Sequence, residues 1–143
     1  MKEITLRAET ENLNQVLDFV NGLLEEKNCP MYVVLELDIA VEELFVNIAH
    51  YAYTPEKGDA TIRVSFENED VIITFIDSGI PYNPWAKEDP DTTLSLEERQ
   101  IGGLGIYMVK KSMDEVDYEY RDGKNVVTIK KKIGNDEART KIR

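Results

Sequence analysis

The sequence predicts an α+β fold, a two-layer α/β sandwich in which helices pack on a mixed, mostly antiparallel sheet. Two early segments, at about 11–27 and 31–53, carry apolar residues at helical spacing. Later segments alternate apolar and polar residues and occur as two adjacent pairs joined by short polar links. Because helices and paired strands occupy separate blocks, the pattern argues against the alternating βαβ units of a parallel sheet.

The first 53 residues are predicted to hold one strand and two helices. Residues Lys2 to Arg7 alternate and indicate a strand, and Thr10 is a plausible N-cap for the first helix. Pro30 separates the two helices. The apolar stripe of the first helix comprises Leu13, Val16, Leu17, Val20, Leu23 and Leu24, and that of the second comprises Val34, Leu37, Val41, Leu44, Phe45 and Ile48.

Two hairpins are predicted in the remaining chain. In the first, the alternating runs at 62–66 and 71–75 are joined by the polar link at 68–70. In the second, strands at about 115–120 and 124–133 flank Asp122-Gly123, which is a strong hairpin turn. Between the hairpins, the chain from Asp77 to Gly105 shows neither helical nor strand periodicity. A loop of this length is typical of functional lids and binding loops. A short helix at about 104–113 follows this stretch.

Length and composition favour one domain and exclude several function classes. The 143 residues suit a single core, which we place at residues 1–134, with a polar tail at 135–143. The formal net charge of −11 argues against direct nucleic-acid binding. Cys29 is the only cysteine, which excludes an internal disulfide and a cysteine-rich metal site. Neither a membrane-spanning run nor a signal-peptide pattern is visible, so we expect a cytoplasmic protein without membrane contact.

The second predicted helix carries three polar side chains on one flank. Glu43, Asn47 and His50 fall within a sector roughly 60° wide at about 100° per residue. For a helix taken alone, a solvated polar face is the more common explanation of such a pattern. The functional interpretation therefore depends on the two glycine-containing segments that follow.

The first glycine segment is Asp77-Ser78-Gly79, which ends an apolar strand. A partly shielded carboxylate at a strand end can accept a hydrogen bond from a purine amine, and glycine permits close approach of a flat ring. The second segment is Gly102-Gly103-Leu104-Gly105, which leads into an apolar helix. Free amides at a helix N-terminus bind phosphate oxygens. An ordinary turn and a flexible hinge are the structural alternatives.

The order of these parts resembles the GHKL ATPase family. Glu43-x-x-x-Asn47 matches its N-box, Asp77-Ser78-Gly79 its G1 box and Gly102-Gly103-Leu104-Gly105 its G2 box. The resemblance spans the chain from the first strand to about Ile133. Within the family, the runs 77–84 and 105–115 resemble the RsbW-type anti-sigma-factor serine/threonine kinases. A histidine-kinase origin fits less well, because there is no room for a dimerisation helix pair with a phospho-accepting histidine.

The resemblance implies a GHKL (Bergerat) fold and specific roles at the site. Asn47 would coordinate Mg²⁺ that bridges the phosphates of ATP, Glu43 would act as general base, and Asp77 would recognise adenine. The remaining implied ATP-binding residues are Gly79, which would admit the ring, and Gly102, Gly103, Leu104 and Gly105 at the phosphates. His50 is a further candidate that could touch phosphate, pair with Glu43 or cap the core.

Two positions stay open within the resemblance. Many relatives carry a threonine near the adenine in the last strand pair, and both Asn125 and Thr128 are candidates for that place. Trp85 could pack on the nucleotide or a partner, or make a hydrophobic contact beneath the loop.

The implied function is ATP-dependent transcription regulation through protein partners. The resemblance implies phosphorylation of a serine or threonine on a STAS-domain anti-sigma-factor antagonist, binding of a sigma factor, and a possible homodimer. A nucleotide-gated binding module without kinase turnover is the alternative from another class, and a weak intrinsic ATPase is a third. The sequence names neither the partner nor the signal.

Overall fold

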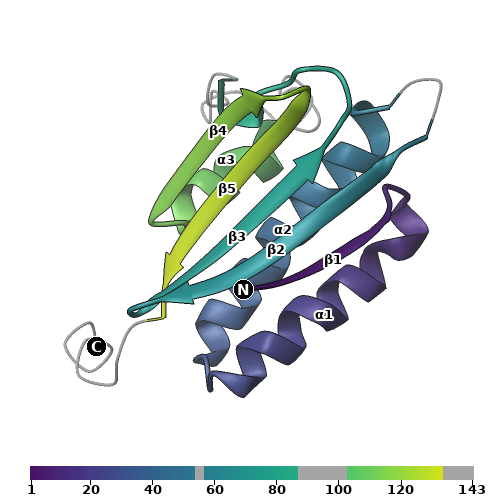
Figure 1. Ribbon diagram of the computed structural model, residues 1–143. Coiled ribbons are helices and arrows are strands. Elements are labelled where there is room, and N and C mark those ends of the chain that lie inside the picture. Colours follow the sequence, from purple (N-terminus) through teal and green to yellow (C-terminus); the bar gives the residue numbers. More distant parts are fainter. Residues whose placement is uncertain (54–56, 87–102, 134–143) are drawn as a thin grey trace.

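The computed structural model describes residues 1–53, 57–86 and 103–133. In this part of the chain, three α-helices cover one face of a five-stranded sheet whose order is β1-β2-β3-β5-β4 (Figure 1). Each of the four described strand pairs is antiparallel, whereas we expected a mixed sheet. The predicted two-layer α+β class is confirmed.

The N-terminal elements lie close to their predicted positions. Strand β1 spans Lys2–Arg7, α1 spans Leu13–Glu26 and α2 spans Met31–Tyr51. The prediction that Thr10 caps the first helix is wrong. Thr10 instead begins the 3-10 turn η1 (Thr10–Asn12), which tightens the chain before α1 and makes no side-chain cap hydrogen bond.

The two predicted hairpins form, and their pairing places the site. Strands β2 (Asp59–Glu67) and β3 (Asp70–Asp77) make the first, and β4 (Glu115–Arg121) and β5 (Lys124–Lys132) make the second. Asp122 and Gly123 both adopt positive φ, of 56° and 76°, as a tight two-residue turn requires. The second hairpin joins the sheet through β5, so that β5 and not β4 lies beside β3.

The core lies between the sheet and the helical layer. Alternate residues of β3 and β5 are buried, as expected for strands with one covered face. The short helix α3 spans Gly103–Ser112, and a second 3-10 turn, η2, spans Pro84–Ala86. The largest fully buried side chains include Phe45, Phe75, Leu24, Leu37, Ile62, Ile73 and Ile129.

Candidate functional site

Asp77 ends β3 on the helix-covered side of the sheet and is only 5% exposed. Its Oδ1 atom accepts two hydrogen bonds, from the backbone N–H of Gly79 and from Nδ2 of Asn125, both at 2.9 Å. Its Oδ2 atom has no hydrogen-bond donor among the described residues. The carboxylate is therefore held in place and still presents one free acceptor.

Asn125 lies directly opposite Asp77, because β5 pairs with β3 in that register. It is 2% exposed, and its side chain bonds to Asp77, to the backbone of residues 80 and 82, and to the hydroxyl of Tyr118. Thr128, the other candidate from the sequence, pairs with Thr74. Thr128 is half-buried, and it is three positions from Asn125 along β5. Because successive side chains of a strand alternate between the two faces, Thr128 lies on the sheet face away from the helices. The register thus places Asn125 at the site and Thr128 outside it.

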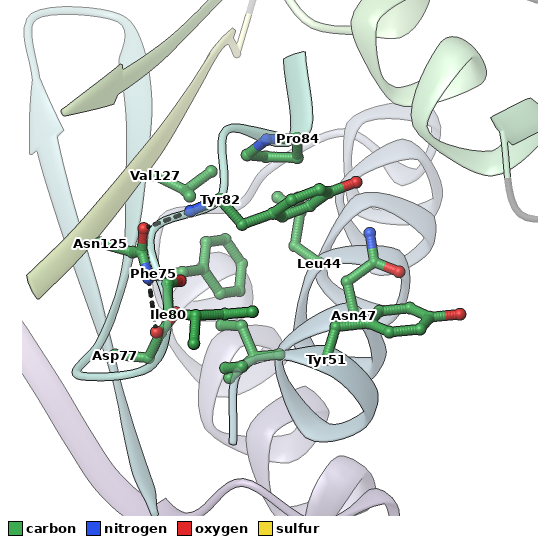
Figure 2. A pocket seen from close by; sticks show the side chains of 12 residues that line it. Leu44, Asn47, Tyr51, Phe75, Asp77, Ile80, Tyr82, Pro84, Asn125 and Val127 are labelled. Carbon is green, nitrogen blue, oxygen red and sulfur yellow. Dashed lines mark hydrogen bonds between the residues drawn. The ribbon is translucent and has the colours of Figure 1, made fainter. Parts of the chain in front are cut away.

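A pocket lies between the ends of these strands and α2 (Figure 2). Asp77 and Asn125 line its strand side, while Leu44, Asn47 and Tyr51 line its helix side. The other lining residues are Ile48, Ala52, Phe75, Ile80, Tyr82, Pro84 and Val127. The wall is mostly apolar with a few convergent polar groups, which is the usual character of a small-molecule site.

The free space in this pocket is small, at about 30 Å³. At roughly 10–15 Å³ for one water, this space holds only a few waters, so a purine ring could enter only if some lining side chains moved. Ile80 and Tyr82 are the candidates, because their side chains are 61% and 45% exposed. They rearrange at lower cost than the buried Phe75, whose packing the core fixes.

Asn47 and Glu43 lie one helical turn apart on α2, and both are half-buried. Asn47 lines the pocket, and its amide has no hydrogen-bond partner within the described residues. Its side-chain oxygen is therefore available to a ligand or an ion.

Glu43 lies against the first turn of α3. A Cβ placed on Gly105 would come within 2.2–2.5 Å of the Glu43 carboxylate atoms, so the carboxylate occupies the space that a side chain would fill. Burial raises the pKa of Glu43, and the neighbouring charge of Glu42 raises it further. A carboxylate with a raised pKa is a stronger base than an exposed one.

The remaining predicted residues divide into three groups. Gly103 begins α3, and Leu104 and Gly105 follow in its first turn, while Gly102 lies outside the described residues. His50 is exposed and lines a separate pocket with Glu9, Lys57 and Tyr53. The structure therefore brings Asn47 and Asp77 to one pocket and Glu43 to the start of α3, and it leaves His50 apart from them.

Gly79 determines how closely the end of β3 approaches the end of α2, and its expected contact with the adenine ring stays a prediction. A Cβ on Gly79 would lie 2.2 Å from the backbone oxygen of Ala52, at the end of α2. The same oxygen accepts a hydrogen bond of 3.0 Å from the N–H of Ile80. The missing side chain thus allows the strand end to approach the helix end closely, and this contact places Asp77 beside α2.

Several residues that position the site have no clear signal in the sequence. The Tyr53 hydroxyl donates to the carbonyl of Asp59 and accepts from the N–H of Ser78, each at 2.7 Å. Trp85, one of the open positions, donates from Nε1 to the carbonyl of Asp117 at 2.8 Å and packs on the edge of the core. Tyr53 and Trp85 form hydrogen bonds with residues in other segments of the chain, so only the folded chain identifies their partners.

The described residues show no helix long and apolar enough to cross a membrane. Within the same part of the chain, no group of three or more His, Cys, Asp or Glu side chains is placed to hold a metal ion.

Comparison with known proteins shows similarity to nucleotide-dependent kinases. Residues 6–131 match the family model of the histidine kinase-like ATPase domain. The serine/threonine-protein kinase BtrW of Bordetella bronchiseptica is 30% identical over 96 residues, which cover 65% of this chain and 66% of that protein. The serine-protein kinase RsbW of Bacillus velezensis is 26% identical over 133 residues, or 90% of this chain and 83% of that protein. RsbW of Listeria monocytogenes is 24% identical over 116 residues, with 78% and 74% coverage.

Proposed function

The chain belongs to the histidine kinase-like ATPase family, as its three motifs predicted, and we propose that it transfers the γ-phosphoryl group of ATP to a serine or threonine of a protein partner. The observation that carries this proposal is the arrangement around α2. One apolar pocket is lined by Asp77 and Asn47, whose Oδ2 atom and side-chain amide have no partner among the described residues, and Glu43 lies one turn away against the start of α3. The matched relatives named as serine-protein kinases support the same reaction class.

In the proposed complex, the adenine lies against the strand ends and the phosphates lie toward α3. The exocyclic amine of adenine would donate to Asp77 Oδ2, which has no other donor among the described residues. The amides at the start of α3, from Gly103 to Gly105, would bind phosphate oxygens, because the N–H groups of the first turn have no partner within the helix. His50 and Gly102 stay predictions for phosphate contact.

The residues present fit a magnesium ion bound together with the nucleotide. Mg²⁺ keeps several waters and takes one or two protein oxygens beside substrate phosphates. The unpartnered side-chain oxygen of Asn47 can supply one such ligand. When bound, the ion would neutralise phosphate charge, which the acidic chain with net charge −11 cannot do by itself.

Glu43 is the proposed general base of the transfer. Its carboxylate would accept the proton of the partner's hydroxyl while that oxygen bonds to the γ-phosphorus. The bond from the γ-phosphorus to the bridging oxygen would break, and ADP would leave with that electron pair. The raised pKa of Glu43, which results from burial and from Glu42, favours proton acceptance.

The proposed acceptor is a small STAS-domain antagonist, with a sigma factor as a second partner. The resemblance of 77–84 and 105–115 to the RsbW-type proteins supports this assignment. A homodimer and a cytoplasmic location belong to the same proposal.

Affinity capture from native lysate with Mg-ATP, followed by intact-mass measurement of the captured proteins, tests the proposed function. We expect a small partner that carries one added phosphoryl group, and we expect this product to be missing when Glu43→Ala is the bait. Glu25→Ala, a change at an exposed position of α1, is the matched control and should give the product. A partner captured only with nucleotide and never modified would replace the kinase with a nucleotide-gated binding module.

Calorimetry on the purified protein tests the nucleotide site independently. Asp77→Asn places an amide where the purine amine needs an acceptor, so Mg-ATP binding should be abolished. Asp18→Asn, at an exposed position of α1, should bind normally. Unchanged affinity in Asp77→Asn would remove Asp77 from the adenine site.

A further inference from the structure

We propose that Asn125 determines the base specificity of this site without touching the base, by fixing Asp77 so that only Oδ2 faces the purine amine. This inference rests on the proposed ATP-binding function. Asn125 is a positioning residue in this role, because it acts through Asp77 and through the backbone of residues 80–82. The supporting observations are its hydrogen bonds, its burial and its register.

All four hydrogen-bonding positions of the Asn125 amide are occupied. Its two N–H groups donate to Asp77 Oδ1 at 2.9 Å and to the carbonyl of Ile80 at 2.8 Å. Its oxygen accepts from the N–H of Tyr82 at 3.0 Å and from the hydroxyl of Tyr118. A primary amide has two donors and two acceptor lone pairs. Asn125 therefore has no donor or acceptor left for a nucleotide.

The surrounding groups also determine which way the amide points. If oxygen and nitrogen were exchanged, the Asn125 oxygen would face the carboxylate of Asp77 and the carbonyl of Ile80, which are both acceptors. Its NH₂ group would face the N–H of Tyr82, which is a donor. Only one orientation satisfies these partners, and at 2% exposure water cannot compensate for the other.

This orientation leaves Asp77 with two unequal oxygens. The Asn125 and Gly79 donors both bind Oδ1 and hold the plane of the carboxylate. Oδ2 is left as an acceptor without a donor among the described residues, on a side chain that lines the pocket. A 6-amino purine can donate to such an acceptor, whereas a 6-oxo purine presents a second acceptor to it and is repelled. The discrimination between the two bases therefore depends on how firmly Asn125 holds Asp77.

The same amide fixes the opposite wall of the pocket. Its bonds to the carbonyl of Ile80 and the N–H of Tyr82 hold the backbone that carries two exposed lining side chains. Figure 2 shows two of the Asn125 hydrogen bonds as dashed lines, one to Asp77 and one to the N–H of Tyr82. One residue thus sets both the acceptor and the wall against which a base would stack.

The test compares Asn125→Asp with the wild-type protein in binding Mg-ATP and Mg-ITP by calorimetry. Aspartate keeps the size of the side chain and its acceptor oxygens, and it loses the donors to Asp77 and Ile80. We expect ATP affinity to fall by about tenfold to a hundredfold, as for loss of a hydrogen bond to a charged group. Affinity for ITP, whose base offers no 6-amino group, should change by less than about threefold, so the preference for ATP should largely disappear.

The matched control is Thr128→Val in the same strand. Thr128 lies on the opposite sheet face, so its replacement should leave the ratio of ATP to ITP affinity unchanged. Thermal unfolding of each variant shows whether it folds. If Asn125→Asp does not fold, Asn125→Ala, which has no donor and adds no charge, should show the same loss of preference.

Equal losses of ATP and ITP affinity in the folded variant would mean that Asn125 only stabilises the fold, and this would overturn the inference. Unchanged affinities for both nucleotides would overturn it as well. If ATP binding still depended on Asp77 in either case, the proposed function would stand. A wild-type protein that binds neither nucleotide would overturn the proposed function together with this inference.

Discussion

Glu43 must be ionised to act as a base, yet its surroundings favour the protonated form. Burial is the larger cause of its raised pKa, and the charge of Glu42 is the smaller one. Because the folded state holds this proton more tightly than the unfolded state, the contribution of Glu43 to stability is greatest at low pH. It declines as pH rises through the raised pKa. The protein thus gives up some stability near neutral pH to hold a reactive carboxylate.

The pH dependence of phosphoryl transfer should report this residue. Glu42→Gln removes the neighbouring negative charge, so the pKa of Glu43 should fall and the acidic limb of kcat/KM should move to lower pH. Glu25→Gln, far along the chain on α1, is the control and should leave the profile in place. A limb that does not move in Glu42→Gln would show that another group controls the rate.

The contact between the end of α2 and the end of β3 is the element-scale feature that builds the site. Ala52 closes α2 and its carbonyl accepts from Ile80, while Gly79 allows the two backbones to meet. Tyr53 reinforces the junction through its hydroxyl. The free acceptor of Asp77 and the amide of Asn47 share one pocket because this junction is closed.

Replacing glycine by alanine should have three different effects in this chain. Gly79→Ala forces a Cβ against the backbone of Ala52, so the free energy of unfolding should fall by about 1–3 kcal/mol. Gly22→Ala, at an exposed position inside α1 with no atom within 4 Å of the added Cβ, should raise it by about 0.5–1 kcal/mol. On Gly105 the three atoms nearest to an added Cβ belong to the flexible end of Glu43, so Gly105→Ala should leave stability nearly unchanged and lower the rate of phosphoryl transfer.

Urea unfolding measures the first two changes, and a transfer assay on the folded protein measures the third. Equal stability of Gly79→Ala and Gly22→Ala would contradict the importance of the junction. Normal transfer by Gly105→Ala would show that the position of Glu43 against α3 does not matter.

We propose that the chain forms one domain whose functional unit ends near residue 134. The family match ends at residue 131 and β5 ends at Lys132. The N–H of Ile133 still bonds to the carbonyl of Glu69 in the first hairpin link. Ile133, the last residue that the structure describes, is therefore bonded to the first hairpin next to the proposed boundary.

Deleting residues 135–143 should change the free energy of unfolding by less than about 0.5 kcal/mol and leave the affinity for Mg-ATP unchanged. Deleting residues 130–143 is the control, since it removes the end of β5 and should unfold the protein. A clear loss of stability or affinity in the shorter deletion would place the tail inside the functional unit.

The sequence alone determined the fold class, the two hairpins and the family. Helical spacing, strand alternation and the turn at 122–123 are local properties, and each acts over a few residues. The order of three short motifs identified the family, which the match over residues 6–131 confirms. For the same reason, the ends of β1, α1 and α2 were predicted to within a few residues, while the capping role of Thr10 was not.

Only the tertiary structure decided which distant residues meet. Asp77 and Asn125 are 48 positions apart, and they meet because β5 pairs with β3 in a fixed register. That register also separates Asn125 from Thr128, since a difference of three positions along a strand reverses the face. His50 matched Glu43 and Asn47 in helical angle, yet it lines another pocket, together with residues of η1 and with Tyr53 and Lys57. Strand order and register depend on long-range packing, and a local pattern carries no information about either.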